Sequence, residues 1–233
     1  LDHRDDLEAR LIGRSPQMAK VRQLILDVAG AAVDVLIFGE TGTGKEMVAR
    51  CLHDLSGAKQ ENYVALNCGG MADNLLDSEL FGHEPGAFTG AQKRRIGKIE
   101  YASGGTLFLD EVESMPMNMQ IKLLRVLQER VIERLGSNQL VPVSCRVVAA
   151  SKDDLKVLSD QGKFRADLYY RLNVVRIELP PLRERREDIL PLARHFLTFY
   201  GGIDGPRLMP DAEAVLRSYP WPGNVRELEN VMK

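Results

Sequence analysis

The segment "GETGTGKE" at residues 39–46 has the glycines, hydroxyls and lysine of a phosphate-binding loop. A short apolar run over 34–39 precedes it and a helical pattern over about 44–54 follows it, which is the context that such a loop requires. The glycines let successive amide N–H groups turn toward an anion, and the helix N-terminus adds partial positive charge. Lys45 is therefore expected to reach the β- and γ-phosphates of a nucleotide.

Two adjacent carboxylates end a second apolar run, "GGTLFLDE" at 104–111. A strand of this kind brings them to the edge of a parallel sheet, beside the phosphate loop. Asp110 is expected to hold Mg²⁺ through its water shell, and Glu111 to orient the attacking water. These residues together predict an ATPase with ATP and Mg²⁺ as cofactors. One departure is Glu46, which stands where a Ser or Thr hydroxyl usually contacts Mg²⁺.

Two arginines in "GKFRADLYYRLN", 162–173, are candidates for charge stabilisation. On one helix, Arg165 and Arg171 would lie about 120° apart and would not share a target. Each is either a surface salt-bridge partner or a residue that reaches the γ-phosphate bound by a neighbouring subunit.

Apolar runs alternate with helical patterns through most of the chain, which predicts an α/β fold with a mostly parallel sheet covered on both faces. The expected strands are 34–39, 63–68, 106–111, 145–151 and 174–179. The expected helices between them include 17–30, 44–54 and 119–131. The segment 129–143 is expected to be an added hairpin that turns at Gly136-Ser137-Asn138.

The paired prolines in "LPPLRERRED", 179–188, end this alternation, and the later pattern is helical only. It predicts helices over about 186–200, 211–218 and 223–233. We therefore expect an α/β nucleotide-binding core over 1–180 and a small α-helical lid over 181–233. The last helix reaches Lys233 without a capping glycine, which predicts that the lid continues beyond it.

Composition narrows the class of protein. The net charge of −2 provides no global basic field to recruit nucleic acid. Three cysteines without CxxC spacing argue against a disulfide framework or a zinc site and fit buried thiols in a reducing cytoplasm. No apolar run approaches the ~20 residues that a membrane span needs, so no membrane partner is expected.

The stretch "FGHEPGAFTGAQKRR", 81–95, follows neither a helical nor a strand period. Its glycines predict a mobile loop, and Phe88 is its one large aromatic beyond the first residue. An exposed aromatic on such a loop is suited to insertion into a partner.

These motifs resemble the central AAA+ ATPase domain of bacterial sigma-54-dependent transcriptional activators, the enhancer-binding proteins. The matching pieces, in order along the chain, are "LIGRSPQM", "GETGTGKE", "ELFGHEPGAFTGA", "GGTLFLDE", "FRADLYYRLNV", "LPPLRERREDI" and "WPGNVRELEN". GAFTGA, at 86–91, is close to diagnostic of that family. "FLDEVESMP" and "ERLGSN" resemble response regulators of the C4-dicarboxylate transport type.

The resemblance implies a P-loop AAA+ core whose loop insertion, 82–93, touches sigma-54 in the RNA polymerase holoenzyme. It implies self-association into a hexameric or heptameric ring, enhancer DNA bound only through a domain absent from this chain, and an upstream receiver or sensor of a two-component system. The residues it implies for contact with sigma-54 are Gly86, Ala87, Phe88, Thr89, Gly90 and Ala91.

The resemblance also implies roles at the nucleotide. Asn67 would hold Glu111 toward or away from water, Arg165 and Arg171 would act in trans, and Arg226 would sense phosphate from the lid. The implied nucleotide contacts are Ile12, Gly39, Glu40, Thr41, Gly42, Thr43, Gly44, Lys45, Glu46 and Arg226.

Two departures from the family pattern bear on these roles. Lys152 replaces the neutral amide that more often follows the fourth strand, and Pro85 precedes GAFTGA where a charged residue is common. Two alternatives stay open at this point: a general protein unfoldase or metal-insertion ATPase that uses pore loops, and a non-catalytic nucleotide-binding scaffold.

Overall fold

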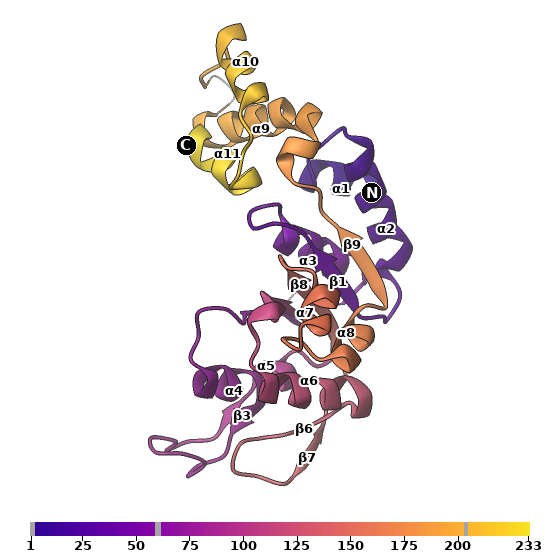
Figure 1. Ribbon diagram of the computed structural model, residues 1–233, viewed down its shortest axis with the longest axis vertical. Coiled ribbons are helices and arrows are strands. Elements are labelled where there is room, and N and C mark those ends of the chain that lie inside the picture. The colour runs from indigo at the N-terminus through magenta and orange to yellow at the C-terminus, as the bar shows by residue number, and fades with distance from the viewer. Residues whose placement is uncertain (1–2, 59–61, 203–204) are drawn as a thin grey trace.

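A parallel five-stranded sheet forms the centre of the protein (Figure 1). The computed structural model describes residues 3–58, 62–202 and 205–233, so residues 1–2 and 59–61 of the predicted core and 203–204 of the predicted lid lie outside it. The strand order is β2-β5-β8-β1-β9. The strands are β1 (Val35–Phe38), β2 (Tyr63–Asn67), β5 (Thr106–Asp110), β8 (Arg146–Ser151) and β9 (Val175–Glu178). All five predicted strands are confirmed to within a residue or two at each end.

The register of the sheet aligns the carboxyl ends of its strands. Phe38, the last residue of β1, is opposite Ser151 of β8, and Asn67 of β2 is opposite Asp110 of β5. The segments that follow these strands therefore emerge along one edge. This is the edge at which parallel α/β sheets bind ligands.

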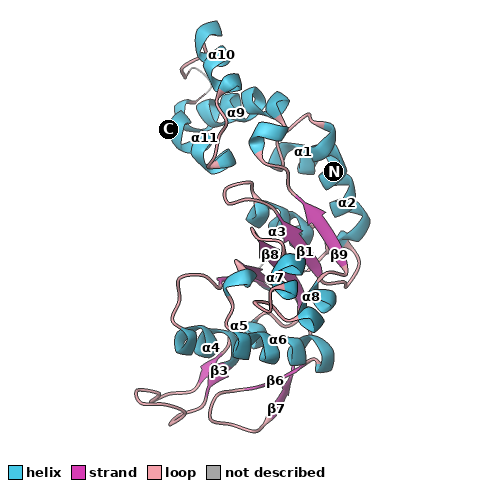
Figure 2. Cartoon of the chain, viewed as in Figure 1, coloured by secondary structure: helices cyan, strands magenta, loops and turns pink. Residues whose placement is uncertain are grey.

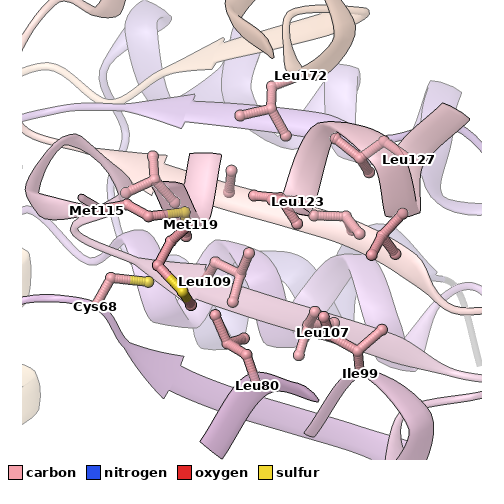
Figure 3. Close-up of a cluster of buried hydrophobic side chains, with 14 of the residues drawn as sticks. Cys68, Leu80, Ile99, Leu107, Leu109, Met115, Met119, Leu123, Leu127 and Leu172 are labelled. Atoms are coloured by element: carbon pink, nitrogen blue, oxygen red, sulfur yellow. The ribbon is translucent and has the colours of Figure 1, made fainter. Parts of the chain in front are cut away.

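Alternate side chains of the strands enter two separate cores, because successive residues of a strand point to opposite faces. Leu107 and Leu109 pack into one core with Met119, Leu123 and Leu172 (Figure 3). Phe108, between those leucines, packs into the other core. Both faces are thus covered by helices, as a near-continuous apolar strand requires.

The helices that cover the sheet fall into two groups, one on each face. Those that pack on the Phe108 side are α1 (His3–Arg10), α2 (Pro16–Ala29) and α3 (Lys45–Asp54). Those on the Leu107 side are α4 (Asp73–Phe81), α5 (Lys98–Tyr101), α6 (Met117–Glu129), α7 (Leu155–Asp160) and α8 (Ala166–Leu172). The short 3₁₀ turn η2 (Val112–Ser114) follows β5. None of the helices among the described residues is both long and apolar enough to cross a membrane.

Two hairpins extend the core at the end of the molecule farthest from the lid (Figure 2). The GAFTGA segment lies between β3 (Gly82–His83) and β4 (Arg95–Ile96), which pair antiparallel. The hairpin predicted at 129–143 is confirmed as β6 (Val131–Glu133) and β7 (Leu140–Pro142). A backbone hydrogen bond from the Glu84 N–H to the Leu135 carbonyl joins the β3–β4 hairpin to the β6–β7 hairpin.

The C-terminal part is helical, as predicted. It contains η3 (Leu182–Glu184), η4 (Arg186–Asp188), α9 (Ile189–Gly201), α10 (Pro210–Ser218) and α11 (Asn224–Met232). Its own apolar core includes Leu190, Leu216 and Leu228, together with Trp221, which is 2% exposed. The Trp221 indole N–H donates to the Leu216 carbonyl at 2.8 Å.

We predict that the cysteines do not react with Ellman's reagent at pH 8 while the protein is folded. All three are buried, and burial raises the thiol pKa of Cys51 and Cys145 to about 11 and that of Cys68 to about 12. The reactive thiolate is therefore scarce and shielded. In denaturant, all three thiols are expected to titrate.

A matched control is Asn138→Cys, which places a thiol on the exposed turn of the β6–β7 hairpin and should react at once. Rapid reaction of the native thiols without denaturant would contradict the packing described above.

Candidate functional site

The phosphate loop, residues 39–46, follows β1 and ends in the first turn of α3. Gly42 and Gly44 have φ of 81° and 108°, a left-handed backbone that glycine adopts at little cost. A Cβ at Gly42 would lie 2.3 Å from the carbonyl oxygen of Gly223 in the lid, so this position also needs glycine for close packing. Lys45 Nζ donates to the carbonyls of Gly39 and Glu40, at 2.7 and 3.0 Å.

A pocket of about 380 Å³ opens above this loop, between the sheet edge and the lid. Of the predicted nucleotide residues, it is lined by Ile12, Thr41, Gly42, Thr43, Gly44, Lys45, Glu46 and Arg226. Asn67, Asp110 and Glu111 line it as well. Gly39 and Glu40 belong to the same loop but line a neighbouring pocket. The fold thus brings together residues that follow β1, β2 and β5 and a residue of the lid. Their closeness in space could not be read from their separation in the sequence.

The acidic side of the pocket lies at the end of β5. The Glu111 N–H donates to Asp110 Oδ1 at 2.9 Å. Burial raises the pKa of Asp110, against the lowering effect of that hydrogen bond and of the Lys45 charge. Burial likewise lowers the pKa of Lys45, opposed chiefly by the negative charges of Asp110 and Glu113. Cation and carboxylates therefore compensate one another in a partly dehydrated site.

Glu111 packs against the turn that follows β2. Its φ of 53° is unusual for a residue other than glycine. A Cβ at Gly69 would lie 2.1 Å from Glu111 Oε2 and 3.1 Å from Asn67 Oδ1, so this glycine makes room for both side chains. Asn67 Oδ1 accepts the Gly69 N–H at 2.7 Å. Sequence reasoning did not identify Gly69, because its role depends on a neighbour more than forty residues away.

The lid is bonded directly to the phosphate loop. Asn224, fully buried at the start of α11, donates to Glu40 Oε2 at 3.1 Å and to the Thr41 carbonyl at 3.0 Å. Its own Oδ1 accepts the Leu182 N–H at 2.8 Å. Arg183 pairs with the Glu40 carboxylate at 2.6 Å, and the Arg226 N–H donates to the Gly42 carbonyl at 3.2 Å. None of these contacts between the lid and the phosphate loop was predicted; the role predicted for Arg226 was contact with the nucleotide phosphates.

Several predicted residues lie outside the pocket. Arg165 is the residue before α8 and pairs with Asp167 at 2.7 Å, so the prediction that it shares a helix with Arg171 is wrong. A buried Gln120 side chain accepts the Arg165 N–H at 2.9 Å and fixes this boundary. Arg171, within α8, donates to the Leu127 carbonyl at 2.8 Å.

Glu46, by contrast, lines the pocket, and its carboxylate pairs with Arg50 at 2.9 Å.

The GAFTGA loop lies at the opposite end of the molecule from the lid (Figure 1). Within the loop, the Gly86 N–H donates to the Ala91 carbonyl at 2.8 Å, and Ala91 is buried. Phe88 is 47% exposed and its ring meets the His83 ring edge-on, with 4.9 Å between centroids. A Cβ at Gly136, in the second hairpin, would lie 2.8 Å from Ala87 Cβ. The loop is thus supported from one side and open on the other.

Two regions of the chain match known families. Residues 11–178 match the sigma-54 interaction domain, and residues 183–233 match the AAA+ ATPase lid domain. The chain is 58% identical over 233 residues to the C4-dicarboxylate transport transcriptional regulatory protein DctD of Pseudomonas aeruginosa, covering 99% of this chain and 50% of that protein. It is 55% identical over 223 residues to DctD of Rhizobium meliloti, covering 94% of this chain and 48% of that protein. It therefore spans about half the length of these relatives.

A solved structure has the same fold. NtrX from Brucella abortus in complex with ATP matches with a TM-score of 0.86 and 38% identity, covering 98% of this chain and 53% of that one. NtrX in complex with ADP matches with a TM-score of 0.88 and 38% identity, covering 98% of this chain and 51% of that one. The predicted AAA+ fold and helical lid are confirmed.

We predict that Asn224→Ala loosens the lid from the phosphate loop. The change leaves the buried Leu182 N–H and Thr41 carbonyl without their partner and puts alanine at a φ of 54°. The free energy of unfolding should fall by about 3 kcal/mol, measured by urea unfolding followed by circular dichroism.

Asn230→Ala is the matched control, because Asn230 is exposed on the same helix. Its free energy of unfolding should change by less than about 0.5 kcal/mol. Equal stability of both variants would show that the Asn224 contacts do not hold the lid.

Proposed function

The chain belongs to the sigma-54 interaction domain family of AAA+ proteins, and we propose that it hydrolyses ATP between the subunits of a ring and thereby moves its GAFTGA loops against sigma-54. The observation that carries this proposal is the combination of one pocket, where Lys45, Asp110 and Glu111 meet, with an exposed Phe88 on a separate supported loop. A bare nucleotide-binding scaffold would need no such loop. We propose a boundary between core and lid near residue 180.

The phosphates of ATP would bind across the loop of residues 39–46. Lys45 now bonds two loop carbonyls and would exchange them for phosphate oxygens, which are more highly charged acceptors. The start of α3 adds the N-terminal partial charge of a ten-residue helix. Arg226 would contribute a further cation from the lid, because it faces the same pocket. The base would lie along apolar side chains of the pocket, among them Ile12, Met18, Leu179, Leu192, Phe196 and Val225.

Asp110 suits a role in holding Mg²⁺ through water. Mg²⁺ keeps several of its waters and is commonly held by one or two carboxylates together with substrate phosphates. Asp110 offers one such carboxylate, next to the loop that would hold the phosphates. Within the described parts of the chain, no cluster of three or more acidic, histidine or cysteine side chains is arranged to hold an ion by itself. When bound, Mg²⁺ would neutralise phosphate charge.

Glu111 would orient and polarise the attacking water. Its carboxylate and the Asn67 amide oxygen both lie against Gly69, so the two side chains are neighbours at this end of the pocket. This supports the proposed role of Asn67 in setting the position of Glu111. Arg165 and Arg171 lie outside the pocket of their own chain, which supports a proposed role at a neighbouring subunit's nucleotide. An arginine of this kind contributes about 10³–10⁵ in rate to NTP hydrolysis.

The partner surface would be the tip of the GAFTGA loop. Phe88 offers the exposed aromatic ring and Thr89 a hydroxyl beside it. Through sigma-54 the loop would act on the RNA polymerase holoenzyme, so that promoter DNA can open. DctD and NtrX are each about twice as long as this chain, and contact with enhancer DNA is proposed only for a separate domain.

We predict that Glu111→Gln lowers the rate of ATP hydrolysis by at least about 100-fold, the usual contribution of a positioned base. Nucleotide affinity should stay within a few-fold, because Glu111 would act on water rather than on the phosphates. Phosphate release and binding of a fluorescent ATP analogue measure the two quantities. Glu129→Gln, on the exposed side of α6, is the control. Negligible hydrolysis by the unaltered protein, at any concentration, would instead support a scaffold.

Phe88→Ala is predicted to weaken sigma-54 binding by at least about 30-fold, as loss of an aromatic anchor does. ATP hydrolysis should change by no more than about twofold, because Phe88 does not line the pocket and the β3–β4 hairpin that carries it lies at the end of the molecule opposite the lid (Figure 1). Co-purification with sigma-54 in the presence of a non-hydrolysable ATP analogue measures binding. Phe199→Ala removes a ring that is 71% exposed on the lid and should leave binding intact. Undiminished binding by Phe88→Ala would refute the assignment of the loop.

A further inference from the structure

The lid contacts the core a second time at the start of α9, in addition to the contacts of Asn224. Asp188, the residue before α9, is fully buried, and its carboxylate makes no capping bond to that helix. Instead, Oδ1 accepts the N–H groups of Arg14 and Ser15 at 2.5 and 2.8 Å. Oδ2 accepts the Ser15 hydroxyl at 2.6 Å. Three hydrogen bonds to one charged group thus join the lid to the chain just before α2.

The core segment that binds Asp188 is shaped for this contact. Gly13 has a φ of 155°, and a Cβ there would lie 2.7 Å from Asp188 Oδ2, so the carboxylate packs directly on the backbone. Ser15 is also fully buried and accepts the Met18 N–H at 3.3 Å as the N-cap of α2. The Asp188 charge therefore lies at the N-terminus of α2, where the helix dipole favours an anion.

The same contact joins two apolar walls of the nucleotide pocket. Leu11 and Ile12, just before the segment that binds Asp188, line the pocket from the core side. Leu192 and Phe196, one turn apart on α9, line it from the lid side. We call these two pairs of side chains the base walls. The Asp188 carboxylate fixes the backbone of one base wall to the helix that carries the other.

A buried arginine extends this contact to the phosphate loop. Arg185 is 2% exposed, lines the pocket, and donates to the Thr43 carbonyl at 3.2 Å. Burial lowers the pKa of its guanidinium, and the negative charge of Asp188 opposes that effect. Asp188 therefore also supplies a negative charge to a buried arginine that would otherwise be costly to keep charged.

We propose that Asp188 is a positioning residue for recognition of the nucleotide base, and that it holds the two base walls at the separation that a planar base requires. Asp188 itself would contact neither the base nor the phosphates. The lid is attached separately to the phosphate loop through Asn224, so loss of the Asp188 contact would open the base side of the pocket while the phosphate side stays closed. The proposal rests on the proposed nucleotide site and adds to it the residue that sets the width of its base side.

Two probes separate the base side from the phosphate side: the β,γ-imido analogue of ATP, and inorganic tripolyphosphate, which has no base. Calorimetry with Mg²⁺ present measures both Kd values. The unaltered protein should bind the ATP analogue at least about 30-fold more tightly, because burial of the base's apolar surface favours binding. Asp188→Ala should raise the Kd for the analogue about 10–30-fold, on the scale of lost hydrogen bonds to a charged group. Its Kd for tripolyphosphate should stay within about threefold, because the phosphate loop keeps its own contacts.

Two milder changes test the same contact with less risk to the folding of the lid. Ser15→Ala removes one of the three hydrogen bonds and should raise the Kd for the analogue about three- to tenfold. Asp188→Asn keeps an acceptor for both N–H groups and offers an amide donor to Ser15 Oγ, so its Kd should lie within about threefold of the unaltered value. Asp211→Ala, at an exposed position in the first turn of α10, is the control and should match the unaltered protein.

A purely structural role for Asp188 would give a different pattern. An unchanged ratio of the two Kd values in Asp188→Ala would show that Asp188 does not act through the base. If Asn224→Ala, which removes the other attachment of the lid, changed that ratio as much, the effect would be general loosening of the lid. Equal binding of both probes by the unaltered protein would exclude a contribution from the base. If the unaltered protein bound neither probe, the proposed function would fail as well, whereas the expected preference in every variant would refute the positioning role alone.

Discussion

The central constraint on this protein is the crowding of opposite charges at one edge of a parallel sheet. Lys45, Lys152, Asp110, Glu111 and Glu113 all lie there, in places only partly open to water. Burial alone would neutralise such groups, as the raised pKa of Asp110 and the lowered pKa of Lys45 indicate. Their mutual attraction keeps the charged forms accessible, and a polyanionic ligand would complete the balance. The alignment of Phe38 with Ser151 and of Asn67 with Asp110 creates this arrangement.

The parts of this arrangement that depend on local pattern were predictable from the sequence. Apolar runs gave the five strands, and glycines at fixed spacing gave the phosphate loop with Lys45. The β-hairpin at 129–143 followed from its turn residues. Each of these signals lies within a few residues of the feature that it specifies.

The parts that depend on contacts between distant segments were not predictable in the same way. Asn224 bonds Glu40 and Thr41 across more than 180 residues, and Gly69 makes room for Glu111 only in the folded chain. Arg165 was wrongly assigned to a helix because Gln120, from another helix, determines where α8 begins. The roles proposed for Arg165, Arg171 and the GAFTGA loop concern other molecules and stay predictions.

The nucleotide pocket and the GAFTGA loop are joined by a short stretch of chain. Asn67 ends β2, Gly69 lies beneath Glu111, and α4 then runs from Asp73 to Phe81 directly into β3. A nine-residue helix is about 13 Å long and has little room to bend. The ion pair of Asp77 with Lys122, at 2.7 Å, ties α4 to α6 and limits its path. Helix α4 is therefore the direct chain connection between the Glu111 side of the pocket and the GAFTGA loop.

The lid contains an intrinsic fluorophore. Trp221 is the sole tryptophan of the chain and lies in the lid core, next to Tyr219 at 4.9 Å between ring centroids. Its fluorescence emission would therefore report on the packing and hydration of the lid, because the sheet contributes no tryptophan fluorescence. Separation of the lid from the phosphate loop and melting of the sheet would have different spectroscopic signatures in the unlabelled, natural sequence.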